Sequence, residues 1–206
     1  MSLVPGCPRC STPVARHGSD GEYSCPEHGV VPALWRPVDA SYEAFVDHLT
    51  LAGSFPTYLP WPLGPGWQVS DFAVVDGRAT LIGLTGTSEL DGPVDILIVA
   101  EEPGTGVGAR AAGTAEPGGS VGEGPPSARV RVGPQPVPLW PMDTTYGAGE
   151  WDRSVLVGEA RGRWLWLVLR PASVLLMLRD EWFLREAGGL GMSLVEVPFG
   201  PGGSSW

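Results

Sequence analysis

Two short and nearly identical motifs lie within the first 28 residues of this 206-residue chain. The first is Cys7-Pro8-Arg9-Cys10, and the second, after a gap of 14 residues, is Cys25-Pro26-Glu27-His28. Together they contain all three cysteines of the sequence. Each motif predicts a tight turn that directs two soft ligands at one point, and two such turns complete the tetrahedron that zinc prefers. We therefore predict a Zn²⁺ site formed by Cys7, Cys10, Cys25 and His28.

The predicted zinc site is structural rather than catalytic, because four protein ligands leave no open coordination position for water or substrate. A structural zinc ion contributes on the order of 10–16 kcal/mol to the folding of a small segment. Two alternatives stay open at this point. The cysteines are free or form a metal-free redox pair, or His17 replaces His28 as the fourth ligand.

The charge of the chain argues against two classes of partner. The formal net charge is −10, and the sequence contains no lysine, so 13 arginines supply every basic side chain. Nucleic-acid binding depends on clustered basic residues that displace counterions from phosphates, and anionic membranes attract the same clusters. We therefore expect neither nucleic acid nor a membrane surface as a partner.

No segment predicts a membrane span or a targeting signal. The most apolar window, residues 164–178, is 15 residues long and is interrupted by Arg170 and Pro171. A spanning helix needs roughly 20 apolar residues, and the N-terminus lacks a charged region followed by an apolar stretch. Because cysteines in a metal-binding arrangement fit a reducing compartment, we predict a cytoplasmic protein.

The hydrophobic pattern predicts an α+β fold. We expect residues 1–36 to form a small zinc ribbon, and residues 37–206 to form a mostly antiparallel sheet with two or three helices. Strands are expected at residues 21–24, 29–31, 67–75, 79–84, 94–100, 128–132, 155–160, 163–170 and 193–197. The run 163–170 is apolar at both odd and even positions, which indicates a central strand covered on both faces. Residues 102–126 contain eight glycines and four prolines and predict a long loop.

Two of the helices expected in residues 37–206 can be placed in the sequence. Asp39 is the expected N-cap of the first, whose apolar residues follow the i, i+3, i+4, i+7 spacing and whose stop signal is Gly53. These apolar residues are Tyr42, Phe45, Val46 and Leu49. His48 lies beside this stripe, so we expect it to be exposed. The second helix is expected within residues 175–187, before Gly188-Gly189.

No motif predicts a catalytic residue. Residues 118–122 match the G-x-S-x-G pattern around Ser120, but a nucleophile elbow needs a strand before it and a helix after it. Here both flanks are rich in glycine and proline. If the protein is an enzyme or binds a small ligand, the best candidates are Glu101, Glu102 and Arg110, at the mouth of the 102–126 loop.

Nine tryptophans are many for a chain of this length. Trp61, Trp67 and Trp140 lie among prolines. Aromatic rings beside prolines can form a groove for a partner protein, although large rings also pack irregular loops onto a sheet. Both interpretations stay open from the sequence.

Several stretches together resemble one actinobacterial family of uncharacterised proteins. They are the two metal-binding motifs, Pro60-Trp-Pro-Leu63 with Gly66-Trp67, Val99-Ala-Glu-Glu-Pro-Gly104 with Gly108-Ala-Arg110, Pro138-Leu-Trp140, and Gly158-Glu-Ala-Arg-Gly162-x-Trp164-Leu-Trp166. The resemblance covers most of the chain and carries over the four zinc ligands position by position. It implies a zinc-bearing cytoplasmic protein and no particular reaction.

The sequence therefore favours a non-enzymatic adaptor protein, in which a zinc ribbon is fixed to an α+β domain and a Trp/Pro-rich surface binds another protein. The alternative is a small-ligand-binding protein or an enzyme that uses a pocket of the α+β domain. A nucleic-acid factor that binds through the ribbon is disfavoured by the charge.

Overall fold

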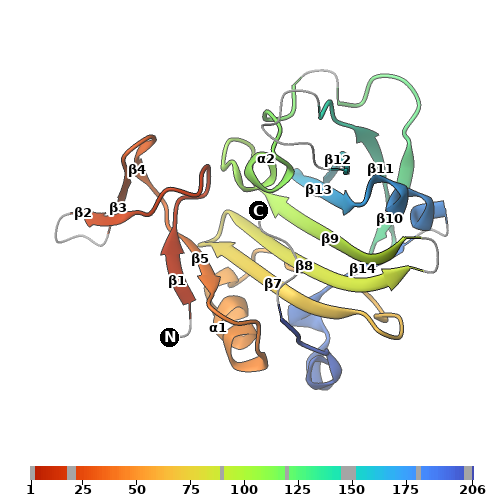
Figure 1. Cartoon of the computed structure of the whole chain (residues 1–206), viewed down its shortest axis with the longest axis horizontal. Helices are drawn as coiled ribbons and strands as arrows, with labels where there is room; N and C mark the ends of the chain where they lie inside the picture. Colours follow the sequence, from red (N-terminus) through yellow and green to blue (C-terminus); the bar gives the residue numbers. More distant parts are fainter. Residues whose placement is uncertain are drawn as a thin grey trace.

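A computed structural model describes residues 3–17, 22–88, 91–118, 121–144, 152–179, 182–201 and 206. Within these residues, one sheet of 11 strands dominates (Figure 1). Its strands are β1 (Leu3–Gly6), β5 (Leu34–Pro37), β6 (Tyr58–Pro60), β7 (Gln68–Val75), β8 (Ala79–Ser88), β9 (Gly92–Glu101), β10 (Ala128–Val132), β11 (Gln135–Pro141), β12 (Ser154–Ala160), β13 (Arg163–Arg170) and β14 (Trp182–Glu186). The order across the sheet is β1-β5-β7-β8-β9-β13-β12-β11-β10-β14-β6.

Neighbouring strands of this sheet pair antiparallel, except that β10 and β14 run parallel. Antiparallel pairing follows from the tight turns between consecutive strands, such as the turn at Asp76-Gly77 between β7 and β8, where Gly77 has a φ of 58°. The structure is antiparallel-rich with few helices, which is consistent with the predicted α+β class. The two outermost strands, β1 and β6, are four and three residues long, and each contains a proline.

Apolar side chains cover both faces of the large sheet and form two separate clusters. Along β13, Leu165, Leu167 and Leu169 belong to the first cluster, whereas Trp166 and Val168 belong to the second. The prediction that 163–170 is a central strand covered on both faces is therefore confirmed. We call the face with the leucines the first face and the face with Trp166 the second face.

The first face is covered by helix α1 (Tyr42–Ala52). The helix begins after Ser41, whose hydroxyl accepts a hydrogen bond from the Ala44 N–H at 3.2 Å, so the predicted cap Asp39 is wrong by two residues. It ends at Gly53, as predicted.

The buried side of α1 differs from the predicted stripe. Its buried residues are Ala44, Phe45, His48 and Ala52, whereas Tyr42 and Val46 are exposed. The prediction that His48 is exposed was therefore wrong. Small alanines let the helix approach the sheet closely, and Thr57 gives the buried imidazole a hydrogen-bond partner at 3.0 Å.

The second face is covered by a short helix, α2 (Val107–Ala112), which lies within the predicted 102–126 loop. Its contact with the sheet is very close. A Cβ at Gly108 would lie 2.2 Å from the indole of Trp166, so only glycine fits at this position. The sequence pattern missed this helix because it has only six residues and is bounded by glycines.

The C-terminal quarter differs most from the prediction. The expected helix within 175–187 is instead a 3-10 helix η1 (Ala172–Arg179) followed by β14, with residues 180 and 181 outside the described part. The expected strand 193–197 is a 3-10 helix, η3 (Gly191–Glu196), which follows the short η2 (Ala187–Gly189). β14 satisfies its backbone groups by pairing with β10 and β6, so tertiary pairing overrides the local pattern.

A separate three-stranded sheet lies between β1 and β5 in the sequence. It consists of β2 (Ala15–His17), β3 (Glu22–Cys25) and β4 (Gly29–Val31), and in Figure 1 it projects away from the large sheet. The strands expected at 21–24 and 29–31 correspond to β3 and β4, although Gly21 lies outside the described residues. The division of the chain at residue 36 stays a prediction. In the described part of the chain, every helix is too short or too polar to cross a membrane.

Candidate metal centre and aromatic pocket

The four predicted zinc ligands come together around one point. Cys7 and Cys10 lie in the turn after β1, Cys25 is the last residue of β3, and His28 lies in the tight turn that leads into β4. Their ligand atoms all lie within 4.8 Å of one another. We call these four residues the metal cluster.

The individual distances in the metal cluster match those around a tetrahedral ion. The Sγ atoms of Cys10 and Cys25 are 3.6 Å apart, and the Nδ1 atom of His28 is 3.6 Å from Cys7 Sγ and 3.5 Å from Cys25 Sγ. Zinc–sulfur bonds of about 2.3 Å and zinc–nitrogen bonds of about 2.0 Å give tetrahedral edges of about 3.5 to 3.8 Å. A disulfide bond would need a separation of about 2.05 Å, and the three cysteines are free. The residues present therefore fit a single metal ion.

The thiols of the metal cluster differ in their electrostatic surroundings. Burial raises the pKa of Cys7 to about 11, although the Arg9 N–H donates a hydrogen bond to its Sγ at 3.4 Å. Burial also opposes ionisation of Cys10, but hydrogen bonds from the Thr12 hydroxyl and backbone, and from the neighbouring thiols, lower its pKa to about 7. A cation at this point would favour the thiolate form of all three cysteines.

The alternative ligand His17 lies elsewhere. It is exposed at the end of β2, opposite Glu22 of β3, and is not part of the metal cluster. The structure therefore brings together the set with His28 rather than the set with His17. The identity of the ion stays a prediction.

The metal cluster is attached to the second face of the large sheet by two arginines. The Arg9 guanidinium donates a hydrogen bond to the Gly104 carbonyl at 2.8 Å. The Arg110 guanidinium, from α2, donates a hydrogen bond to the Cys7 carbonyl. The turn that carries the first two candidate ligands is thus fixed to the segment that covers Trp166.

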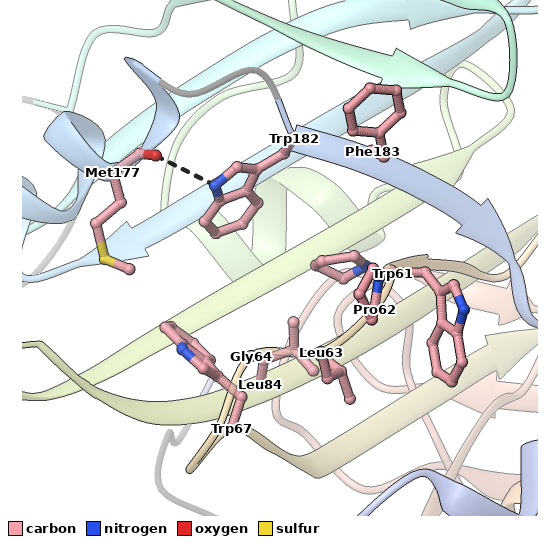
Figure 2. Close-up of a pocket in the computed structure, with 10 residues that line it drawn as sticks. Trp61, Pro62, Leu63, Gly64, Trp67, Leu84, Met177, Trp182 and Phe183 are labelled. Atoms are coloured by element: carbon pink, nitrogen blue, oxygen red, sulfur yellow. Dashed lines mark hydrogen bonds between the residues drawn. The ribbon is translucent and has the colours of Figure 1, made fainter.

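The first face carries a pocket of about 370 Å³ between the chain after β6, strand β14 and η1. Figure 2 shows its labelled side chains, with aromatic rings on both sides of the space. The lining residues are Pro60, Trp61, Pro62, Leu63, Gly64, Trp67, Leu84, Met177, Trp182 and Phe183. We call this set the aromatic pocket.

Main-chain and side-chain hydrogen bonds fix the walls of the aromatic pocket. The Trp61 N–H donates to the Phe183 carbonyl at 2.9 Å, which joins its two sides. The Trp182 Nε1–H donates to the Met177 carbonyl at 3.2 Å, the bond drawn in Figure 2. Phe183 remains 54% exposed, so one wall is open to solvent.

A second pocket, of about 420 Å³, shares five residues with the aromatic pocket: Trp61, Pro62, Leu63, Gly64 and Trp67. Its other residues are Pro65, Gly66, Gln68, Glu196 and Pro198. Glu196 is exposed on η3, beside the exposed side chain of Val195. Glu196 therefore lines the second pocket, whereas the guanidinium carbon of Arg131 lies 5.8 Å from the ring centroid of Phe183, which lines the aromatic pocket.

Of the three tryptophans singled out in the sequence, Trp61 and Trp67 line the aromatic pocket and Trp140 does not. The Trp140 indole instead donates to the Gly124 carbonyl at 3.1 Å. Sequence reasoning missed Trp182, Phe183 and Met177, since it placed them in a helix. The only signal for them was the aromatic pair followed by Leu184, which is typical of a strand.

The alternative candidates Glu101, Glu102 and Arg110 do not share a pocket. Glu101 is fully buried, and its Oε2 accepts a hydrogen bond from the Val107 N–H at 2.8 Å. Burial raises its pKa to about 7. Glu102 is half-exposed and lies 3.5 Å from Arg78 Nε, while Arg110 lines an open pocket that neither glutamate lines. Ser120 lies outside the described residues.

Comparison with known proteins identifies the family. The chain belongs to the family described as "Family of unknown function (DUF6758)", which matches residues 1–205. No curated protein and no solved structure matches it significantly.

Proposed function

We propose that this protein is a non-enzymatic interaction protein, in which a structural zinc ion stabilises the N-terminal segment and the aromatic pocket binds a proline-rich, basic segment of another protein. The aromatic pocket is the observation that carries this proposal. It is built from tryptophan and proline side chains contributed by two distant parts of the chain, and it is partly open to solvent.

The lining of the aromatic pocket favours an extended, proline-rich occupant. All ten lining residues are uncharged. Grooves lined by aromatic rings bind proline-rich segments, because the polyproline II conformation is already formed in solution and loses little entropy on binding. The stretch Trp61 to Gly64 and Trp67 line both pockets, so an extended segment can cross these residues and contact both pockets.

The charges around the pockets favour a basic residue in that segment. The chain carries a net charge of −10, and the exposed Glu196 lines the second pocket. A basic side chain placed there would gain electrostatic attraction, while an acidic one would be repelled. The aromatic pocket, where Arg131 lies near Phe183, offers no such advantage to a basic residue.

The metal cluster supports a structural role for zinc. Three thiolates and one imidazole form a soft donor set, and four protein ligands leave no position for a substrate. When bound, the ion would join the turn that carries Cys7 to the end of β3, which carries Cys25. The buried apolar cluster around β2 to β4 is small and consists of Cys7, Cys25 and Val31. The ion would therefore stabilise these short strands. Because three free thiols persist in a reducing compartment, we propose a cytoplasmic location.

Peptide titration tests the proposed partner. Two synthetic polyproline peptides, one ending in arginine and one ending in glutamate, are titrated into the zinc-bound protein, and binding is followed by isothermal titration calorimetry. We expect the arginine peptide to bind more tightly. Trp182→Ala should weaken its binding at least about tenfold, whereas Trp140→Ala, outside the pocket, should leave it unchanged.

The charge of Glu196 provides a second control. Glu196→Arg should reverse the preference, so that the glutamate peptide binds more tightly than the arginine peptide. Equal binding of both peptides to the native protein, or equal weakening by Trp182→Ala and Trp140→Ala, would contradict the proposed occupant. Native mass spectrometry of the purified protein checks the metal separately, with one zinc ion per chain expected.

A further inference from the structure

Trp206 lies on the second face of the large sheet, next to the segment that holds the metal cluster. Its ring is buried in the second cluster, with 9% of its surface exposed. Its Nε1–H donates a hydrogen bond of 2.6 Å to Asp71 Oδ2. In Figure 1 the C-terminal mark accordingly lies close to α2 and β9.

Two arginines stack on the Trp206 ring. The guanidinium carbon of Arg36 is 4.5 Å from the ring centroid, and that of Arg110 is 4.9 Å from it. Arg36 also forms a two-point ion pair with Asp71, and Asp71 Oδ1 accepts the Phe72 N–H at 2.8 Å. The buried carboxylate and two cations therefore form a site whose shape and charge match an indole: an acceptor for its N–H and cations for its π face.

Arg110 belongs to this indole site and to the surroundings of the metal cluster at once. The guanidinium that stacks on Trp206 also donates to the carbonyl of Cys7. The Arg110 side chain is only partly exposed, so its position depends on the groups that contact its guanidinium. These groups include the Cys7 carbonyl and the Trp206 ring.

We propose that Arg36, Asp71 and Arg110 form an indole-binding site that Trp206 fills in a metal-dependent manner, with Arg110 coupling the two sites. A bound ion fixes the turn that carries Cys7, and the Cys7 carbonyl then orients Arg110 over the indole. Loss of the ion frees the turn, removes one acceptor of Arg110 and releases Trp206 from the sheet. This inference rests on the metal site of the proposed function but is independent of the aromatic pocket.

Coupling between two binding events is reciprocal, and this gives the first test. Trp206→Ala should weaken Zn²⁺ binding by at least about fivefold, at the low end of typical coupling factors. The measurement is competition for Zn²⁺ with a chromophoric chelator. Trp140→Ala removes the same ring from a site where its indole donates to the Gly124 carbonyl, and it should leave the Zn²⁺ affinity unchanged. Equal affinities for the native chain and Trp206→Ala would overturn the coupling.

Fluorine NMR of the full chain labelled with 5-fluorotryptophan gives the second test. The resonance missing from Trp206→Phe identifies Trp206. Chelation of zinc should move that resonance to the position of a solvent-exposed indole, and added Zn²⁺ should restore it. An unchanged Trp206 resonance after zinc removal would overturn the proposal.

Arg110→Gln keeps the test decisive even if the zinc-free chain unfolds. With excess Zn²⁺ this variant should still bind one ion, yet its Trp206 resonance should lie at the exposed position. The matched control is Arg9→Gln, which removes a contact between the same turn and Gly104 but none with Trp206. A Trp206 resonance that is native-like in Arg110→Gln would refute the role of Arg110. If the native chain binds no zinc at all, the metal site of the proposed function fails first, and the two failures are thereby distinguished.

Discussion

The two faces of the large sheet are covered in different ways. On the first face, α1, β6 and the 3-10 helices supply mostly apolar side chains, and the aromatic pocket lies among them. On the second face, α2 also packs through apolar side chains, but Trp206 is contacted by three charged groups, Arg36, Asp71 and Arg110. Apolar packing tolerates changes of shape, whereas each buried charge depends on a particular partner. The first face therefore suits adaptable contact with a partner, and the second suits a response to a single event such as metal binding.

The largest expected effect is the loss of zinc binding, which should leave the structure around the aromatic pocket intact. Cys25→Ser removes one of four ligands and should abolish stoichiometric zinc binding, which in a complete structural site is worth about 10–16 kcal/mol. Hydrogen exchange should then lose protection in β2, β3 and β4, while the sheet around the aromatic pocket keeps it. His17→Ala is the control and should retain one zinc ion per chain. Full zinc binding by Cys25→Ser would contradict the four-ligand site.

The next effect concerns acid stability and the first face. Burial lowers the pKa of His48 from 6.5 to about 3, so below pH 6.5 the unfolded chain binds a proton that the folded chain does not. Because of this residue, the free energy of unfolding should decrease by about 1.4 kcal/mol for each unit by which the pH is lowered below 6.5. The total decrease should be about 5 kcal/mol near pH 3. Urea unfolding of His48→Gln at several pH values checks this, because the variant should lack that slope.

The second face should show the opposite pH response. Burial raises the pKa of Glu101 from 4.5 to about 7, so between these values the folded chain keeps a proton that the unfolded chain releases. Stability from this residue is therefore complete below pH 4.5 and falls as the pH rises to 7, by about 3 kcal/mol in all. Glu101→Gln should remove this loss and be more stable than the native protein at pH 8.

These two slopes should largely cancel between pH 4.5 and 6.5. The combined contribution of these two residues to stability should then be nearly constant in this range, and each single variant should reveal the slope contributed by the remaining residue. A free energy of unfolding that increases with pH in Glu101→Gln and decreases with pH in His48→Gln would support the comparison of the two faces. Parallel profiles for both variants would contradict it.

The smallest effect on stability concerns the open wall of the aromatic pocket. Phe183→Ser changes a side chain that is 54% exposed, so the free energy of unfolding, measured by thermal unfolding, should change by no more than about 0.5 kcal/mol. Binding of the arginine-ended polyproline peptide should nevertheless weaken severalfold. A large loss of stability with unchanged peptide binding would show that this wall is core rather than a contact surface.

The metal cluster was predictable because its members lie within 22 residues of one another in the sequence and zinc coordination imposes their spacing. Strand β13 was predictable for a similar reason, since its two-sided apolar pattern has one common explanation. In contrast, β14 depends on pairing with β10 and β6, and the segment after η3 is joined to β7 by a bridge between Phe199 and Val69. No local pattern encodes these pairings. The aromatic pocket combines residues 60–67 with residues 177–183, so only the folded sheet brings it together. Asp71 and Trp206 are 135 positions apart and carried no sequence signal at all.

The edges of the large sheet have a consequence for self-association. An exposed edge offers unpaired N–H and C=O groups to any other strand, and wide sheets are prone to grow by this route. Here the outermost strands β1 and β6 are short, and Pro5 and Pro60 each remove a backbone donor. Eleven strands can therefore lie side by side without either edge becoming a template for aggregation.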